Sequence, residues 1–526
     1  MFSSWGSYGK PLLTYGAVPV LCALISVYLG LDISWDVQNY HLYNAWAHLH
    51  ERYQLDLAPA GAQSFFNPLF DLFWYGLLQI LPLPATGFVL GLLHGLNFVL
   101  LRAIALELLG HVPGAQRFCW LLAALALLSV GFLSELGTVM HDNLVALLML
   151  TALLLALRSL TQSPPAQQRS LLLAGVVAGI VCAGKLTGAI YALALAIALL
   201  AESWLQRPRW QQRLLPAAIY SASVAVTMLV IGGYWYWFNW HNFGNPLFPL
   251  FNNMFGSELA TPESHRDERF LPTRWVDWLF RPVLLSLEPY LASEYPYRQY
   301  GWALLFFAVL IAVCVWAYRR RQHRAATTTV RSGYVLLGTF AVASWLLWLK
   351  LFGIYRYLIT LELLVPLLMV LVLIFLLGER RGCIATLVIF GLLAIHNVKK
   401  APDWGHAAWA PQPVAVVKPA DAGEMGAVLL MGQPLAWLVP AFDLPVPFIQ
   451  LLPNFHVGPS YQRAISDRID GSRPLSVIFD PAVHGFEQTA QQLAQSNYQL
   501  AQQDCEDLKA SMGQTSFTYH YCRVTR

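Results

Sequence analysis

The stretch "PLLTYGAVPVLCALISVYLGLDISWDVQNYHLYNAWAH", residues 11–48, joins an apolar run to a polar, aromatic segment. Residues 11–30 have the length and composition of a helix that crosses the hydrocarbon core of a bilayer, which takes about 20 residues. Asp36 follows shortly after this run, together with two tyrosines and two histidines. Ionisable groups so close to the membrane are usually paired or functional, so this exit from the first span is where a site is expected.

The same apolar pattern recurs along most of the chain. Of the 526 residues, 57% are hydrophobic and 12% are charged, whereas soluble proteins carry about 25% charged residues. The composition therefore predicts a polytopic α-helical membrane protein with about eleven spans. The expected spans are residues 11–30, 86–108, 118–137, 142–158, 170–184, 186–202, 214–238, 300–318, 333–352, 355–377 and 382–398.

Basic residues in the short loops predict the orientation, because such loops are enriched in Lys and Arg on the cytoplasmic side. The loop arginines fall on one side when every span is counted. The N-terminus is then cytoplasmic, and residues 31–85, 239–299 and 399–526 lie outside, on the periplasmic face of a bacterial inner (plasma) membrane. The first span is expected to be a retained helix and not a cleaved signal peptide. The arginines are Arg158, Arg169, Arg207, Arg209, Arg213, Arg319, Arg320, Arg321, Arg324, Arg331, Arg380 and Arg381.

The composition changes after the last apolar run. We predict a transmembrane domain over residues 1–398 and a small extracytoplasmic α/β domain over residues 399–526. The second domain has no phosphate-binding glycine loop and no nucleophile elbow, so its expected role is structural or in positioning an acceptor. Its expected strands are residues 427–431, 475–480 and 516–524, and its expected helix is residues 485–496.

The seven cysteines divide into two groups. Five lie in apolar runs and are expected to pack there. Cys505 and Cys522 lie in the predicted outside domain, and an oxidising compartment favours a disulfide between them. No CxxC spacing indicates a metal or redox site.

Ionisable residues gather at the outer ends of the predicted spans. A charge at membrane depth costs about 2.5 to 3.5 kcal/mol on insertion scales, so acids and bases that converge at one face can form a site. Most of these residues also have a plainer explanation. Asp36 can simply end a span, and Asp142 can cap a helix. His141 can be a solvated or capping neighbour, and the two basic residues can reach the lipid headgroups. The residues are Asp36, Glu135, His141, Asp142, Lys185 and Arg356.

The segment after Asp36 has helical spacing. Trp35, Leu42, Trp46 and Leu49 form an apolar stripe, which is typical of a helix that lies in the membrane interface. We expect this helix on the outer leaflet, with its aromatic residues as interfacial anchors.

In order along the chain, these segments resemble the GT-C superfamily of membrane glycosyltransferases, in the branch of protein mannosyltransferases and aminoarabinose transferases. The resemblance covers most of residues 10–400, and it implies a GT-C-like fold. The segments are "DVQNYHLYNAWAHL" (36–49), "FFNPLFDLFWYGLL" (65–78), "HDNLVALLML" (141–150), "GKLTG" (184–188), "YWYWFNWHNFGNPLFPLFN" (234–252) and "YRYLITLELLVPLL" (355–368).

Two positions depart from the pattern of this branch. Asn67-Pro68 stands where the branch has a basic residue before a pair of prolines, and Asp36 is followed by Val37 and Gln38 instead of a second acid. A metal site of the DxD kind is therefore not indicated. We expect no cofactor, with a divalent metal as the open alternative.

The resemblance implies that a sugar is transferred, with inversion, from a polyprenyl-phosphate donor to an acceptor on the periplasmic face. Asp36 would be the general base that deprotonates an acceptor hydroxyl. Lys185 and Arg356 would stabilise the negative charge on the departing lipid phosphate.

Five further residues receive roles from the same resemblance. Glu135 or Asp142 would orient the acceptor or a basic partner. Tyr40, His41 and Asn67 are candidates for binding sugar hydroxyls, and the alternative for each is plain surface polarity. The acceptor can be a lipid, a glycan or a protein, and no nucleic-acid partner is expected.

Two other classes of protein remain open. A transporter or flippase of a lipid-linked or anionic envelope substrate would place ionisable residues near the middle of the membrane, with helices broken there in paired halves. A scaffold for an envelope assembly would leave the outer charges unexplained. A charged stretch at residues 263–269 is either a solvated loop or a cover over a cleft.

Overall fold

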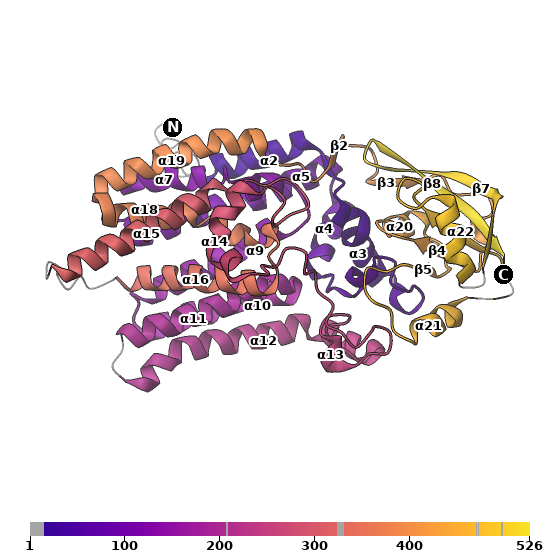
Figure 1. The fold of residues 1–526 in the computed structure, drawn as a ribbon, viewed down its shortest axis with the longest axis horizontal. Coiled ribbons are helices and arrows are strands. Elements are labelled where there is room, and N and C mark those ends of the chain that lie inside the picture. The colour runs from indigo at the N-terminus through magenta and orange to yellow at the C-terminus, as the bar shows by residue number, and fades with distance from the viewer. Residues whose placement is uncertain are drawn as a thin grey trace, which may run out of the picture.

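The structure is a computed structural model that describes residues 15–206, 209–322, 331–469, 471, 473–495 and 498–525. A bundle of long helices forms one end of the molecule and a sheet domain forms the other, with α3 (Leu42–Leu49) and α4 (Leu69–Ile80) between them (Figure 1). The start of the first expected span, Arg207 and Arg324 lie outside the described residues.

Among the described residues, eight helical segments are long and apolar enough to cross a membrane. A ninth crossing is a bent pair, in which η5 (Tyr355–Leu358) and α17 (Ile359–Glu362) meet α18 (Val365–Leu377) at 49°. The eight comprise α5 (Leu83–Gly95) with α6 (Asn97–Leu109), α9 (Asp142–Ser159), α10 (Pro164–Gly184), α11 (Ala189–Gln206) with the preceding η4 (Leu186–Gly188), α12 (Trp210–Phe243), α15 (Tyr300–Arg321), α16 (Ser332–Leu351) and α19 (Glu379–Lys400).

The two remaining expected spans correspond to shorter apolar helices, α2 (Ala17–Leu29) and α7 (Ala115–Ala126). The chain breaks after α7 and resumes helix at α8 (Val130–Ser134). The Asn397 side chain donates a hydrogen bond of 2.9 Å to the Leu128 carbonyl in this break, which satisfies a backbone group that the interrupted helix leaves free. The prediction of a polytopic helical membrane protein is confirmed.

Glycines let the helices that carry the site approach one another closely. A Cβ atom at Gly175 of α10 would lie 2.5 Å from the Tyr220 carbonyl oxygen of α12, and one at Gly179 would lie 2.8 Å from the Val224 oxygen. This spacing of small residues is typical of tight helix pairs in membranes. Gly91 of α5 makes the same kind of approach to α2. The helix pairs α10–α12 and α2–α5 therefore pack with their backbones in close contact.

The C-terminal domain contains a six-stranded sheet in the order β3-β7-β8-β6-β4-β5. The neighbouring strands β4 and β6 are parallel and completely buried, which explains their continuous apolar sequence. The strands are β3 (Val414–Val416), β4 (Ala427–Met431), β5 (Phe448–Gln450), β6 (Leu475–Phe479), β7 (Gln499–Met512) and β8 (Thr515–Thr525). The helices are α20 (Leu438–Phe442), α21 (Tyr461–Arg468) and α22 (Phe486–Gln495).

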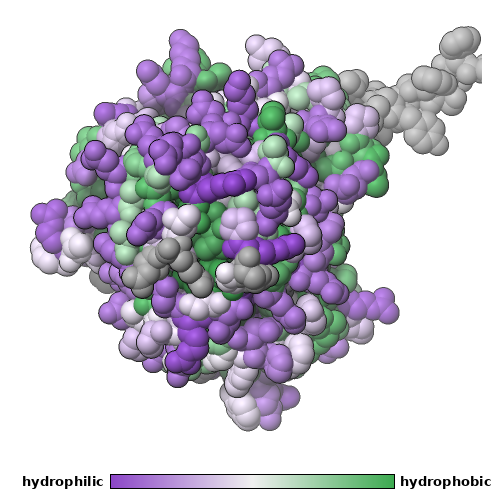
Figure 2. All heavy atoms as spheres, turned by 90° about the vertical axis from the view of Figure 1, so that its right-hand side faces the viewer, coloured by the Kyte–Doolittle hydropathy of each residue, from purple (hydrophilic) through white to green (hydrophobic). Residues whose placement is uncertain are grey.

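The predicted α/β character of this domain is confirmed, including the strands at residues 427–431, 475–480 and 516–524. The predicted disulfide between Cys505 and Cys522 is also present, and it joins the neighbouring strands β7 and β8. Figure 2 shows this end of the molecule, whose surface is largely hydrophilic. A hydrophilic end is consistent with a domain that projects into water.

The domain is fastened to the segments that follow the first span. β1 (Leu31–Asp32) pairs with β2 (His406–Ala407), and the buried Arg52 donates hydrogen bonds of 2.9 and 2.6 Å to the carbonyl oxygens of Leu444 and Val446. The Trp437 amide donates to the Gln38 carbonyl at 3.0 Å. The domain and the region around Asp36 thus share one packed interface.

This interface corrects half of the expectation of a lipid-facing helix after Asp36. The segment is helical, as η1 (Val37–His41) followed by α3, but Leu42 and Trp46 are buried in a core that includes Trp437 and Leu438 of the domain. Trp35 and Leu49, the other two residues of the apolar stripe, are exposed. An amphipathic pattern identifies an apolar face without saying whether lipid or protein covers it. The shorter elements of these outer segments are η2 (Arg52–Gln54), η3 (Gly61–Phe65), α13 (Asn252–Phe255), α14 (Trp275–Leu287) and η6 (Ala422–Glu424).

Candidate functional site

Asp36 and Arg356 form an ion pair that joins the segment after the first span to the bent crossing. Asp36 precedes η1, and Arg356 lies on η5, in the bent crossing. The Arg356 Nη1 donates to Asp36 Oδ2, and the two side chains are only 17% and 8% exposed. The Tyr40 hydroxyl donates to the same carboxylate oxygen at 3.3 Å. Asp36 is therefore a held, mostly buried carboxylate and not a solvated end of a span.

Lys185 and Asp142 form a second buried pair. Their Nζ and Oδ2 atoms lie 2.7 Å apart, and Lys185 also donates to the Met140 carbonyl at 2.5 Å. Asp142 is the first residue of α9 and Lys185 directly follows α10, so two helix ends position the pair. The alternative for Lys185 and Arg356 was that they reach the lipid headgroups. This alternative is wrong, because each of the two side chains is paired with a carboxylate.

Tyr357 lies between the two ion pairs, and the sequence analysis did not identify it. The centroid of its ring is 5.4 Å from the Lys185 ammonium nitrogen and 5.2 Å from the Arg356 guanidinium carbon. A cation near an aromatic ring gains about 0.5 to 2 kcal/mol, with the higher values where water is excluded. The Tyr357 ring thus contacts both basic side chains, Lys185 and Arg356.

Glu135 completes this group and is its least satisfied member. It is 1% exposed, and neither carboxylate oxygen has a hydrogen-bond partner among the described residues. It interacts electrostatically with Asp142, Lys185 and Arg356. The structure therefore brings together the five charged residues that the sequence singled out, and we call them the ion-pair cluster: Asp36, Glu135, Asp142, Lys185 and Arg356.

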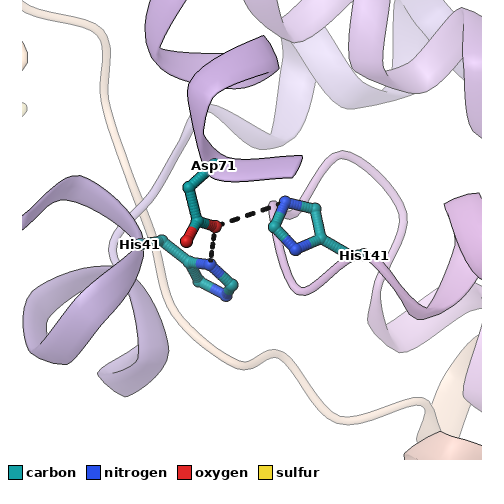
Figure 3. Close-up of side chains that lie close together, drawn as sticks. All are labelled: His41, Asp71 and His141. Atoms are coloured by element: carbon teal, nitrogen blue, oxygen red, sulfur yellow. Dashed lines mark hydrogen bonds and ion pairs between the residues drawn. The ribbon is translucent and has the colours of Figure 1, made fainter. Parts of the chain in front are cut away.

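His41 belongs to a neighbouring group with Asp71 and His141, which we call the His–Asp–His cluster (Figure 3). The His41 Nδ1 lies 2.6 Å from Asp71 Oδ1, and the His141 Nε2 lies 3.7 Å from the same oxygen. The three side chains come from η1, α4 and the residue before α9. His41 is 1% exposed, so the alternative of plain surface polarity is wrong for it.

The two clusters adjoin each other. The rings of Tyr40 and His41 have centroids 4.0 Å apart, and Tyr40 is the residue that bonds to Asp36. Burial raises the pKa of Asp71 well above its ordinary value, while Lys185 lowers it and Asp36 raises it further. Burial also lowers the pKa of His41 well below its ordinary value. At neutral pH, His41 is therefore a neutral imidazole that can act as a donor, an acceptor or a ligand.

Asp71 had no predicted role because its sequence context does not reveal one. It lies inside the apolar, aromatic segment 65–78, where a single acid is an ordinary feature of a helix that starts nearby. Its role depends on His41 and His141, which are distant in sequence and meet it only in the fold. Local spacing carries no signal for such a meeting.

Other polar residues serve the scaffold or lie elsewhere. Asn67 accepts from the Leu69 amide and donates to the Ala183 carbonyl, which ties α4 to α10. The charged stretch at residues 263–269 forms its own exposed ion pairs. It lines a cavity of about 280 Å³ together with Phe455 and His456 of the C-terminal domain.

No protein-family model and no curated protein matches this sequence. The fold, in contrast, is similar to that of a membrane protein of known structure. The apo structure of ArnT from Cupriavidus metallidurans matches with a TM-score of 0.56 at 15% sequence identity, covering 98% of each chain. The structure of the same protein bound to undecaprenyl phosphate matches with a TM-score of 0.53 at 12% identity, covering 99% of this chain and 98% of that one.

These matches extend over the bundle and the C-terminal domain alike. The predicted resemblance to GT-C membrane glycosyltransferases is confirmed for the fold. At this level of identity the likeness concerns architecture, and the chemistry must be argued from the ion-pair cluster itself.

Proposed function

We propose that this protein transfers a sugar, with inversion, from a polyprenyl-phosphate donor to an acceptor at the periplasmic face of the inner membrane. The observation that carries the proposal is the ion-pair cluster, in which two basic side chains and three carboxylates are buried together at the outer ends of the helices. A second line of support is the comparison with solved structures. The fold is similar to that of ArnT, a protein whose structure was solved with undecaprenyl phosphate bound.

The two ion pairs suit a site that receives a phosphate. A lipid phosphate that enters the cluster can take over the hydrogen bonds of Arg356 and Lys185, since charge-assisted bonds to phosphate and to carboxylate are of similar strength. Asp36 and Asp142 then lose their basic partners and become free acceptors. Binding of the donor would in this way prepare the carboxylates for reaction.

Asp36 is the proposed general base. Once released from Arg356, its carboxylate can take the proton of an acceptor hydroxyl that attacks the anomeric carbon opposite the phosphate. The bond between the anomeric carbon and the phosphate oxygen breaks, and Lys185 and Arg356 stabilise the charge on the departing lipid phosphate. The products are the glycosylated acceptor and the free polyprenyl phosphate.

Three further residues receive supporting roles in this proposal. Asp142 orients Lys185, and Glu135 orients the acceptor from its position beside both bases. Tyr40 positions Asp36 through its hydroxyl. His41 is too deeply buried to be reached by a sugar without a rearrangement, so we assign it to the His–Asp–His cluster and not to sugar binding.

One observation favours the alternative of a transporter. The crossing formed by η5, α17 and α18 is bent by 49°, and the buried Glu362 at its break accepts a hydrogen bond from the Gly131 amide at 3.2 Å. Broken helices with buried carboxylates are typical of transport sites. Among the described residues, no other pair of apolar helices long enough to cross together is bent by more than 40°. Another candidate for a second broken half is the interruption between α7 and α8.

The test compares envelope glycans and glycolipids by mass spectrometry in a deletion strain that carries wild type, Asp36→Asn or Asp467→Asn. Asp467 is an exposed acid of α21 and serves as the matched control. At equal protein levels in the membrane, Asp36→Asn is expected to reduce transfer by about 10² to 10⁴-fold, as the loss of a general base does. Full complementation by Asp36→Asn would refute the proposed mechanism.

A further inference from the structure

The His–Asp–His cluster has the composition of a metal centre. Its candidate ligand atoms, one from each of His41, Asp71 and His141, all lie within 4.8 Å of one another. Two imidazoles and a carboxylate are a common ligand set for zinc and for other divalent transition metals, with further positions left open. We propose that these three side chains bind a divalent transition-metal ion beside the ion-pair cluster.

The distances between the ligand atoms are close to those expected around a bound metal ion. Two ligand atoms about 2.0 to 2.1 Å from a tetrahedral zinc ion lie about 3.3 Å apart. The observed separations from Asp71 Oδ1 are 2.6 Å to His41 Nδ1 and 3.7 Å to His141 Nε2, so they bracket that value. Figure 3 shows Asp71 between the two imidazoles, with a nitrogen of each ring turned toward it. All three ligand atoms lie within 4.8 Å of one another, so a small shift of one imidazole would bring them to a single ion.

The hydrogen bonding leaves one of these ligands unsatisfied. His141 Nε2 is buried and has no hydrogen-bond partner among the described residues, although it faces Asp71. An unpaired buried polar atom costs about 1 to 3 kcal/mol. Coordination of a metal gives this nitrogen a partner, whereas the His41–Asp71 hydrogen bond alone does not.

Metal binding does not depend on the proposed sugar transfer, because the metal content is measured directly. The full chain is purified in detergent without a polyhistidine tag, stripped with a chelator and titrated with Zn²⁺ and with Co²⁺. Wild type is expected to bind one ion per chain. His141→Gln and Asp71→Asn are expected to weaken binding by about 100-fold or more, since even the loss of an outer-shell partner costs about 10 to 100-fold.

The controls separate a specific site from general effects. His48→Gln removes a histidine of the neighbouring helix α3 that belongs to neither cluster, and its metal affinity is expected to equal that of wild type. If the ligand variants fail to fold, X-ray absorption at the zinc edge of the wild-type protein still counts its imidazole ligands, and two are expected. Wild type without stoichiometric metal, a site without two imidazoles, or undiminished affinity in folded ligand variants would overturn the proposal.

Discussion

Two regions of this protein are rich in charge, and they differ in burial. The ion-pair cluster is composed of side chains that are largely inaccessible and are held by the ends of helices. The stretch at residues 263–269 has a similar density of charge, but its partners are exposed, with the Arg269 side chain at 64%. Exposed pairs contribute little, whereas buried pairs must be compensated or used. Charge density therefore does not mark the site; buried charge does.

Removing one basic side chain from each region tests whether the buried charges contribute more to stability than the exposed ones. Arg356→Met leaves Asp36 buried with Tyr40 as its remaining donor, and it is expected to lower the free energy of unfolding by about 3 to 5 kcal/mol. Arg269→Met is expected to lower it by at most about 1 kcal/mol, because its partners are solvated. Unfolding of both variants in mixed detergent micelles measures the difference. Equal losses would mean that the two regions are energetically alike.

A smaller loss of stability is expected from a change in the helix packing that supports the ion-pair cluster. Gly175→Leu places a side chain against the α12 backbone and is expected to cost about 1 to 3 kcal/mol through overpacking. Gly233→Leu is the matched control, since a Cβ there meets nothing within 4 Å. The same micelle titration measures both changes. Lys185 directly follows α10, so we attribute its position to the close packing of α10 against α12. Equal stability of Gly175→Leu and Gly233→Leu would contradict this.

Much of the fold followed from patterns along the chain. Apolar runs of the right length predicted each crossing, because a bilayer of fixed thickness imposes a fixed helix length. Alternation and apolar runs in the tail predicted the strands around residues 427–431 and 475–480. The helix after Asp36 was expected, but its burial under the C-terminal domain was not, because a pattern of residues does not record its partner.

The sequence predicted which side of the membrane the site residues share, but not which of them are in contact. The membrane confines helix ends to two faces, so the order of the apolar runs and loop arginines was enough to place Asp36, Asp142, Lys185 and Arg356 on one side. The membrane does not determine which of these residues touch. Asp71 and Tyr357 were missed for that reason, since each matters through neighbours from other helices.

The central claim is that the ion-pair cluster receives a lipid phosphate, and binding tests it most directly. Native mass spectrometry of the purified protein with added undecaprenyl phosphate compares wild type, Lys185→Met and the exposed control Lys350→Met. We expect wild type and Lys350→Met to bind one lipid equally, and Lys185→Met to bind at least about 10-fold more weakly, because a charge-assisted hydrogen bond of about 1.5 to 3 kcal/mol is lost. Unchanged binding by a folded Lys185→Met variant would contradict the assignment of this cluster to the donor phosphate.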